Sequence, residues 1–324
     1  MTSHRLQPLF LLSLPRTGST LVQRVLGAHP EIATVSEPWL LLPHLYGGRS
    51  QGIRAEYWQE TAAEALSDFR RELTGGEARY RESLRQFVLS LYEAASPEGT
   101  TYFLDKTPHY HAVAAELDEL FPDGKFVVLW RNPLAVLASL LRTFRASRFE
   151  PYLFAFDLFE GIDNLIRFVE NSGARAHCIR YEDLVSPDGE QAWIGLFGYL
   201  GLEFDPVLLN RFADVPLRGR YGDPNASRFA TLNSERASGW QPTLRGSVRR
   251  AWCRHWLTWI GRRRLAIMGY DLDLLRAELT GGSGGGGDAI DLLHLASSLA
   301  KARARAAALK MPDSPRPRYA TRRG

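Results

Sequence analysis

The chain has 324 residues, 45% of them hydrophobic and 23% charged, which is typical of a globular protein with one large domain or two smaller ones. The net charge is +4, and residues 288–324 alone carry +5. Residues 1–287 therefore have a net charge of about −1 and are not a basic nucleic-acid-binding domain. The longest apolar runs are too short to span a membrane, and Cys178 and Cys253 form no disulfide framework or metal-binding spacing, which favours a cytoplasmic protein.

Short apolar runs alternate with helical patterns over the first 200 residues. The predicted strands are 8–14, 32–36, 101–104, 125–130 and 176–181. The predicted helices are 19–28, 55–73, 78–95, 113–120, 134–144, 152–171 and 191–200. This β-α alternation predicts an α/β protein with a central parallel sheet that helices cover on both faces.

Residues 15–20, Pro-Arg-Thr-Gly-Ser-Thr, join the first predicted strand to the first predicted helix. Such a turn directs several backbone N–H groups, and the positive end of the helix dipole, at one point. Arg16 adds a delocalised positive charge there. The Walker A spacing is absent. The segment therefore predicts a site for a phosphate or sulfate group, and does not by itself indicate an ATPase.

A second anion-binding pattern follows the predicted strand 125–130. That strand ends in Arg131, and Ser139 comes eight residues later on the next predicted helix. The guanidinium offers a planar fork of donors that matches phosphate geometry, so the two side chains can converge on one anion. Taken singly, each residue would more simply be a paired arginine or an exposed serine. Together they predict a second phosphate contact.

The C-terminal part of the chain is predicted to be helical. Trp252, Trp256 and Trp259 fall on one helical face between residues 205 and 279, which indicates core packing rather than a ligand platform. We expect a domain at 1–279, a glycine-rich linker at 280–287 and a basic tail at 288–324 that is partly helical and partly disordered. The tail is interpreted as a solubilising extension, with a weak membrane-surface or partner contact as the alternative.

The two anion motifs, in this order and at this spacing, resemble the sulfotransferases that use 3′-phosphoadenosine 5′-phosphosulfate (PAPS). The resemblance covers roughly residues 8–245. The chain looks like a bacterial member, closer to the tyrosylprotein and carbohydrate-type branch than to the cytosolic small-molecule branch. The resemblance implies a three-layer P-loop-kinase-like α/β fold with an added helical C-terminal part.

The resemblance also implies a donor site. The first loop would cradle the 5′-phosphosulfate, Arg131 and Ser139 would bind the 3′-phosphate, and Tyr181, within Ile-Arg-Tyr-Glu-Asp-Leu, would lie against the nucleotide. The implied loop residues are Arg16, Thr17, Gly18, Ser19 and Thr20. Leu21 stands where cytosolic members have a tryptophan that stacks on adenine, so the adenine contact is not predicted. The family needs no metal, and none is expected here.

Three further positions are implied as catalytic together with Arg16. Glu37, in Ser-Glu-Pro, matches the family's general base, and Lys106, in Asp-Lys-Thr-Pro, matches the lysine near the bridging oxygen. Ser238, in Ala-Ser-Gly-Trp, matches a serine that closes over the donor. Pro108 stands where small-molecule members have a catalytic histidine, and His109 and His111 are out of register with it, which favours Glu37 as the base.

The predicted reaction is the in-line transfer of a sulfuryl group from PAPS to a hydroxyl group of a small molecule, glycan, lipid or peptide. The aromatic stretch 39–46 and the helices within 54–97 are expected to line the acceptor pocket. One alternative is a nucleotide-dependent kinase on the same fold, but a Walker lysine is missing. Another is a non-catalytic protein that binds an anion or desulfated donor (PAP). The joint presence of Arg16, Glu37 and Lys106 argues against it.

Overall fold

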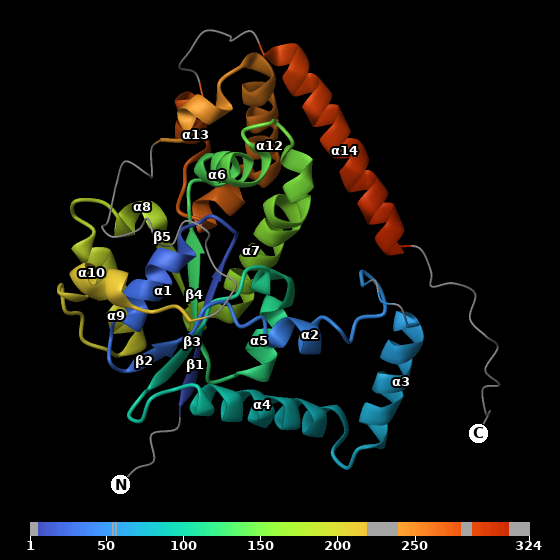
Figure 1. Cartoon of the computed structure of the whole chain (residues 1–324), viewed down its shortest axis with the longest axis vertical. Helices are drawn as coiled ribbons and strands as arrows, with labels where there is room; N and C mark the ends of the chain where they lie inside the picture. The colour runs from blue at the N-terminus through green and yellow to red at the C-terminus, as the bar shows by residue number, and fades with distance from the viewer. Residues whose placement is uncertain (1–5, 54, 56, 219–238, 280–286, 311–324) are drawn as a thin grey trace.

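The computed structural model describes residues 6–53, 55, 57–218, 239–279 and 287–310. Its centre is a sheet of five parallel strands in the order β2-β3-β1-β4-β5 (Figure 1). The strands are β1 (Gln7–Ser13), β2 (Ile32–Thr34), β3 (Tyr102–Asp105), β4 (Lys125–Trp130) and β5 (Ala176–Arg180). All five predicted strands, and their parallel arrangement, are confirmed.

The central strand β1 shows why these apolar runs form a covered sheet. Leu9 and Leu11 pack into one hydrophobic core and Phe10 and Leu12 into another, because successive side chains of a strand point to opposite faces. All four side chains are at most 1% exposed. Burying each contributes roughly 2 kcal/mol, so both faces of the sheet hold the fold together.

Helices cover both faces and complete a three-layer α/β fold (Figure 1). On one face lie α1 (Ser19–Gly27), α8 (Tyr181–Leu184), α9 (Glu190–Leu200), α10 (Leu208–Arg211) and the turn η5 (Phe212–Asp214). On the other lie α4 (Gly76–Ala94), α5 (Ala114–Leu120), α6 (Pro133–Arg145), α7 (Ile162–Ser172), α12 (Ser247–Ile267) and α13 (Leu272–Glu278). The short α2 (Leu41–Leu45) and α3 (Gln59–Glu72) connect β2 to α4.

The segment predicted as one helix over 152–171 is helical throughout but changes type. A 3₁₀ turn, η2 (Pro151–Phe154), precedes a π-helical segment, η3 (Phe156–Gly161), which runs into α7. The π geometry directs Asp157 inward, where it is 8% exposed. Gly161 makes this approach fit, because a Cβ there would lie 2.7 Å from Leu14 and 3.3 Å from the His111 ring. Other short turns are η1 (Tyr110–Val113), η4 (Gly173–Arg175) and η7 (Gln241–Leu244).

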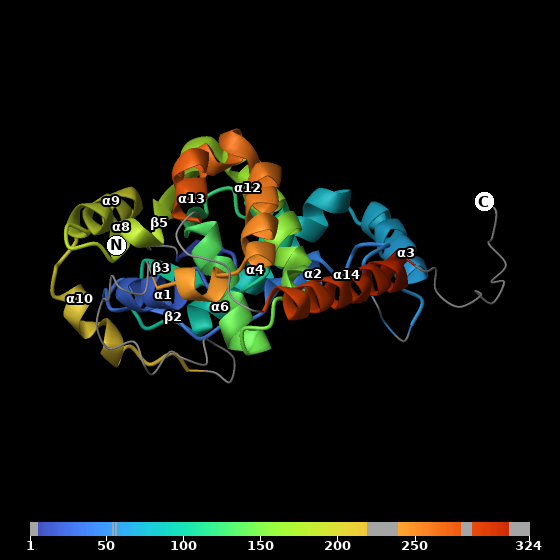
Figure 2. The same ribbon diagram turned by 90° about the horizontal axis from the view of Figure 1, so that it is seen from above.

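The C-terminal helices pack onto the face that carries α6 and α7. Trp252 and Trp256 are buried in this core and Trp259 packs against it, so the predicted core role is confirmed. The helix α14 (Asp288–Lys310) docks onto α12, where Asp291 pairs with Arg249 at 2.6 Å. From there α14 runs toward the side of the molecule that carries α2 and α3 (Figures 1 and 2).

The domain boundaries fall partly outside the described residues. Residues 280–286 of the expected linker and 311–324 of the expected tail are not among those that the structure describes. The division at 279 and 288 therefore stays a prediction. Within the described part of the chain, no helix is both long enough and apolar enough to cross a membrane.

Candidate active site

The loop after β1 lies at the carboxyl end of the sheet, where parallel α/β sheets bind ligands. Thr17 closes the turn by donating its hydroxyl to the Leu14 carbonyl at 2.8 Å. Gly18 has φ 96° and no side chain, and a Cβ there would lie 2.4 Å from the Tyr181 ring. Only glycine therefore lets Tyr181 close against the loop. Helix α1 begins directly afterwards with no side-chain cap, so the first turn of amides faces the same place.

The second anion motif meets this loop. Arg131, at the end of β4, donates to the Arg16 carbonyl at 3.0 Å, and its guanidinium lies 4.5 Å from the centre of the Tyr181 ring. The Arg16 Nε atom donates to the Ser139 hydroxyl at 3.3 Å. Residues from β1, β4, α6 and the start of α8 thus converge. The structure brings together all the described positions that the sequence predicts for the donor.

A third arginine belongs to this cluster and was missed in the sequence. Arg142 lies one turn after Ser139 on α6 and donates to the Gly239 carbonyl at 2.8 Å. Burial, and then the positive charge of Arg16, lower the pKa of Arg142. Burial likewise lowers the pKa of Arg131, and Arg142 adds to that effect. The i, i+3 spacing from Ser139 was an available signal, but arginines are too common in this chain to single one out.

An ion pair forms the neighbouring part of the site. Glu37, in the loop after β2, accepts from Lys106, directly after β3, at 2.6 Å. The two side chains are 11% and 3% exposed, so the pair is largely removed from water. Because β2 and β3 are adjacent and parallel, their carboxyl ends bring the two loops side by side. The structure thus places the predicted base next to the predicted cationic partner.

The model of the Sulfotransferase family matches residues 8–206, which is more than half of the chain and includes both parts of this site. The chain belongs to the sulfotransferase family. Its three-layer arrangement with the glycine-containing loop after β1 is the P-loop-like fold of sulfotransferases.

Individual sulfotransferases and related proteins resemble parts of this chain. The nodulation protein NoeE of Sinorhizobium fredii (strain NBRC 101917 / NGR234) is 34% identical over 135 residues, covering 41% of this chain and 31% of that protein. Protein-tyrosine sulfotransferase 2 of Gallus gallus is 23% identical over 259 residues, covering 74% and 64%. The chain therefore spans less than two thirds of the length of either curated relative.

The fold is also found among solved structures. The sulfotransferase domain from the curacin biosynthetic pathway superimposes with a TM-score of 0.53 and 22% identity, covering 82% of this chain and 98% of that domain. At this identity the likeness concerns the fold alone.

Two histidines and an aspartate form a cluster beside the Glu37 loop of this sulfotransferase. The Nε2 atoms of His109 and His111 lie 3.3 and 3.2 Å from the same Asp157 oxygen. Burial would raise the pKa of Asp157, but the hydrogen bonds and charges of the two imidazoles outweigh it and lower the value. The His109 ring also meets Trp39 edge-on, with centroids 5.7 Å apart. Asp157 was missed because nothing in its sequence context indicates the π segment that turns it inward.

Ser238 lies outside the described residues, so its predicted position has no structural counterpart here. The described residues on either side of 219–238 do lie at the site. The Arg218 carbonyl accepts from the Ser36 amide at 3.0 Å, next to Glu37. The Gly239 carbonyl accepts from Arg142 on the donor side. Arg218 and Gly239, the described residues nearest to Ser238 in the chain, thus both contact the site.

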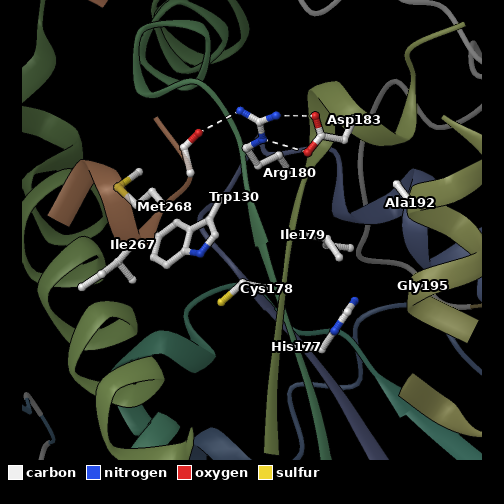
Figure 3. Close-up of a pocket in the computed structure, with 11 residues that line it drawn as sticks. Trp130, His177, Cys178, Ile179, Arg180, Asp183, Ala192, Gly195, Ile267 and Met268 are labelled. Atoms are coloured by element: carbon white, nitrogen blue, oxygen red, sulfur yellow. Dashed lines mark hydrogen bonds and ion pairs between the residues drawn. The ribbon is translucent and has the colours of Figure 1, made fainter. Parts of the chain in front are cut away.

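A pocket of about 370 Å³ along the edge strand β5 is separate from this site (Figure 3). It is lined by Trp130, Cys178 and Arg180 among others, and Arg180 is held there by Asp183 and the Gly269 carbonyl. Burial raises the pKa of the Cys178 thiol, which disfavours the reactive thiolate. None of the predicted site residues lines this pocket. Among the described residues, no group of three His, Cys, Asp or Glu side chains has metal-binding geometry.

Proposed function

We propose that this chain transfers a sulfuryl group from PAPS to a hydroxyl acceptor. The observation that carries the proposal is the cluster of Arg16, Arg131 and Arg142 around Ser139, at the carboxyl ends of β1 and β4. Positive charges that lie together at the carboxyl ends of these strands are stabilised by an anion with several negative groups. PAPS carries such groups on both its 5′ and 3′ positions.

The donor would lie across the loop after β1. We assign the amides of residues 17–20 and Arg16 to the 5′-phosphosulfate, by the amide and dipole argument for a loop before a helix. Arg131 and Ser139 are assigned to the 3′-phosphate, with Arg142 as a further contact. The closely packed Tyr181 would support the nucleotide. The fit rests on the glycine at position 18, where any side chain would displace Tyr181.

Glu37 and Lys106 are the proposed chemical groups. The acceptor oxygen attacks sulfur while the bond from sulfur to the 5′-phosphate oxygen breaks, and Glu37 takes the acceptor proton. Products are a sulfate ester, PAP and a proton held by Glu37. Arg16 and Lys106 would stabilise the charge that develops on the leaving phosphate. The ion pair at 2.6 Å keeps both groups at one place before the donor arrives.

The arrival of the donor gives Lys106 a second anion. Lys106 is then shared between Glu37 and the phosphosulfate, so the Glu37 carboxylate loses part of its counter-ion. The acceptor itself is proposed only as a class, a hydroxyl-bearing small molecule, glycan, lipid or peptide. Trp39, 37% exposed beside Glu37 and His109, offers an aromatic wall for such a molecule.

Calorimetric titration with PAP, and separately with ADP plus magnesium, tests the proposal. We expect PAP to bind the wild-type protein, and Arg131→Ala to weaken that binding by about 10- to 100-fold, since it removes a charge-assisted contact. Arg175→Ala is the matched control, because Arg175 pairs with Asp118 away from the site. Binding of ADP with magnesium and indifference to PAP would instead support a kinase.

A further inference from the structure

Asp105, the last residue of β3, is a fully buried carboxylate with three hydroxyl donors. Its Oδ2 atom accepts from Tyr92 at 2.7 Å and from Tyr110 at 2.8 Å, and its Oδ1 atom accepts from Thr107 at 3.0 Å. The residue is 0% exposed. A carboxylate so far from water is costly unless its oxygens are bonded, so these three bonds hold it in place. Lys106 follows it directly in the chain.

Two of the three hydroxyls also accept hydrogen bonds from the chain that follows Glu37. The Thr107 hydroxyl accepts from the Trp39 amide at 3.2 Å, and the Tyr110 hydroxyl accepts from the Leu41 amide at 3.3 Å. The network therefore joins the chain around Lys106 to the chain just after Glu37. The Tyr92 hydroxyl contributes in a different way, because it ties Asp105 to α4 on the other side.

We propose that Asp105 is a positioning residue that sets the distance between Lys106 and Glu37 through Thr107 and Tyr110. This proposal rests on the proposed function of those two residues. A carboxylate suits the position because it accepts several hydrogen bonds at once and brings no donor of its own. An asparagine of the same shape would direct an NH₂ group at one or more of the hydroxyl donors.

The ionisation of Asp105 bears on the same geometry. Burial raises the pKa of Asp105 to about 6, although the hydroxyls of Tyr92, Tyr110 and Thr107 and the charge of Lys106 act in the opposite direction. These are the groups that face it from α4, η1 and the end of β3. Above that pH Asp105 is a carboxylate that accepts from all three hydroxyls, so the link to the Glu37 loop is tested at a pH above about 6.

The reactivity of Lys106 toward acetic anhydride gives a readout that needs neither donor nor acceptor. The chain has only four lysines, so a short labelling pulse followed by mass spectrometry follows each one separately. Lys106 is held against Glu37, whereas Lys301 is 56% exposed and serves as an internal standard. A looser pair makes Lys106 label faster relative to the standard.

Three variants separate positioning from simple stability. Thr107→Val and Tyr110→Phe each cut the connection to the Glu37 loop, and we expect Lys106 labelling to rise about fivefold, the effect of one lost hydrogen bond. Thr107→Ser keeps the hydroxyl and should restore wild-type labelling. Tyr92→Phe removes an equal bond to Asp105 on the α4 side, so it should lower the melting temperature and leave Lys106 labelling within twofold.

The proposal is overturned if Lys106 labelling is unchanged in both Thr107→Val and Tyr110→Phe, or if Tyr92→Phe raises it as much as they do. Either result would make Asp105 a stabilising residue only. If Thr107→Val fails to fold, the labelling of Lys106 in Tyr110→Phe is sufficient to test the proposal. PAP titration of the same variants tests the two proposals separately. Absent PAP binding would contradict the proposed sulfuryl transfer from PAPS without changing the labelling result.

Discussion

The proposed donor end and the proposed acceptor side of the site differ in how their charges are arranged. At the donor end, Arg16, Arg131 and Arg142 lie near one another, and the positive charge of one lowers the pKa of another. On the acceptor side, Lys106 is matched by Glu37. There two opposite charges form one pair, whereas at the donor end three positive charges lie near one another.

This difference matches the two ligands of the proposed reaction. A preorganised positive cluster binds a polyanion favourably, because the repulsion between its charges is already present in the folded protein and the polyanion relieves it. A hydroxyl acceptor is neutral at the reacting atom and brings nothing to offset a buried charge, so its side is internally balanced. Changes at the donor end should therefore appear in binding, and changes on the acceptor side in turnover.

The largest expected effect is on turnover in Glu37→Gln. The amide keeps the shape but cannot take a proton, so we expect kcat to fall by about 10²- to 10⁴-fold while PAP affinity stays within twofold. The measurement is sulfate transfer from PAPS to a panel of phenols and sugars, with PAP calorimetry on the same protein. His109→Gln is the matched control at the neighbouring imidazole. A larger loss in His109→Gln than in Glu37→Gln would move the base to His109.

A second prediction concerns how Asp105 links stability to pH. Burial raises the pKa of Asp105 to about 6 in the folded protein, above its ordinary value of 3.8. The stability gained by protonating this carboxyl is therefore complete below the lower value and is lost as pH rises through about 6. Relative to Asp105→Asn, the free energy of unfolding of the wild type should increase by about 2 kcal/mol from pH 7.5 to pH 4.5. Urea denaturation of both proteins at the two pH values measures this.

Comparing the wild type with Asp105→Asn cancels the effect of the other carboxyls on the pH dependence of stability. Asp157 and Glu150 have lowered pKa values and act in the opposite direction, but they are present in both proteins. A difference that does not change with pH, or that grows as pH rises, would contradict the burial of an ionisable carboxyl at position 105.

The sequence was most informative where structure and chemistry depend on neighbours in the chain. The five strands were predicted to within two residues, and the apolar runs of β1, β3 and β4 are buried on both faces. The donor loop and the Arg131–Ser139 pair could be found because a strand end fixes where the next residues lie. Lys106 could be singled out because Asp-Lys-Thr-Pro resembles the family's lysine-containing segment.

The sequence was least informative where the contact depends on side-chain reach across the fold. Asp105 is bonded by a tyrosine 13 residues away on α4, and Asp157 meets His111 46 residues away. Nor did the basic composition after residue 288 indicate that Asp291 pairs with Arg249 of α12. Such pairs follow from packing, which periodicity alone does not specify.

The smallest effect is expected for Arg142→Ala, and it tests whether the donor end acts as one cluster. Arg142 is more exposed than Arg131, and its guanidinium already donates one hydrogen bond to the Gly239 carbonyl. Removing its side chain should therefore weaken PAP binding by only about three- to tenfold. Because it also removes a positive charge from the cluster, PAP affinity should depend less steeply on salt concentration. Arg148→Ala, an exposed arginine just beyond the same helix, is the control and should change neither quantity. Equal losses in both variants would mean that overall charge, and not the arrangement around Ser139, attracts the anion.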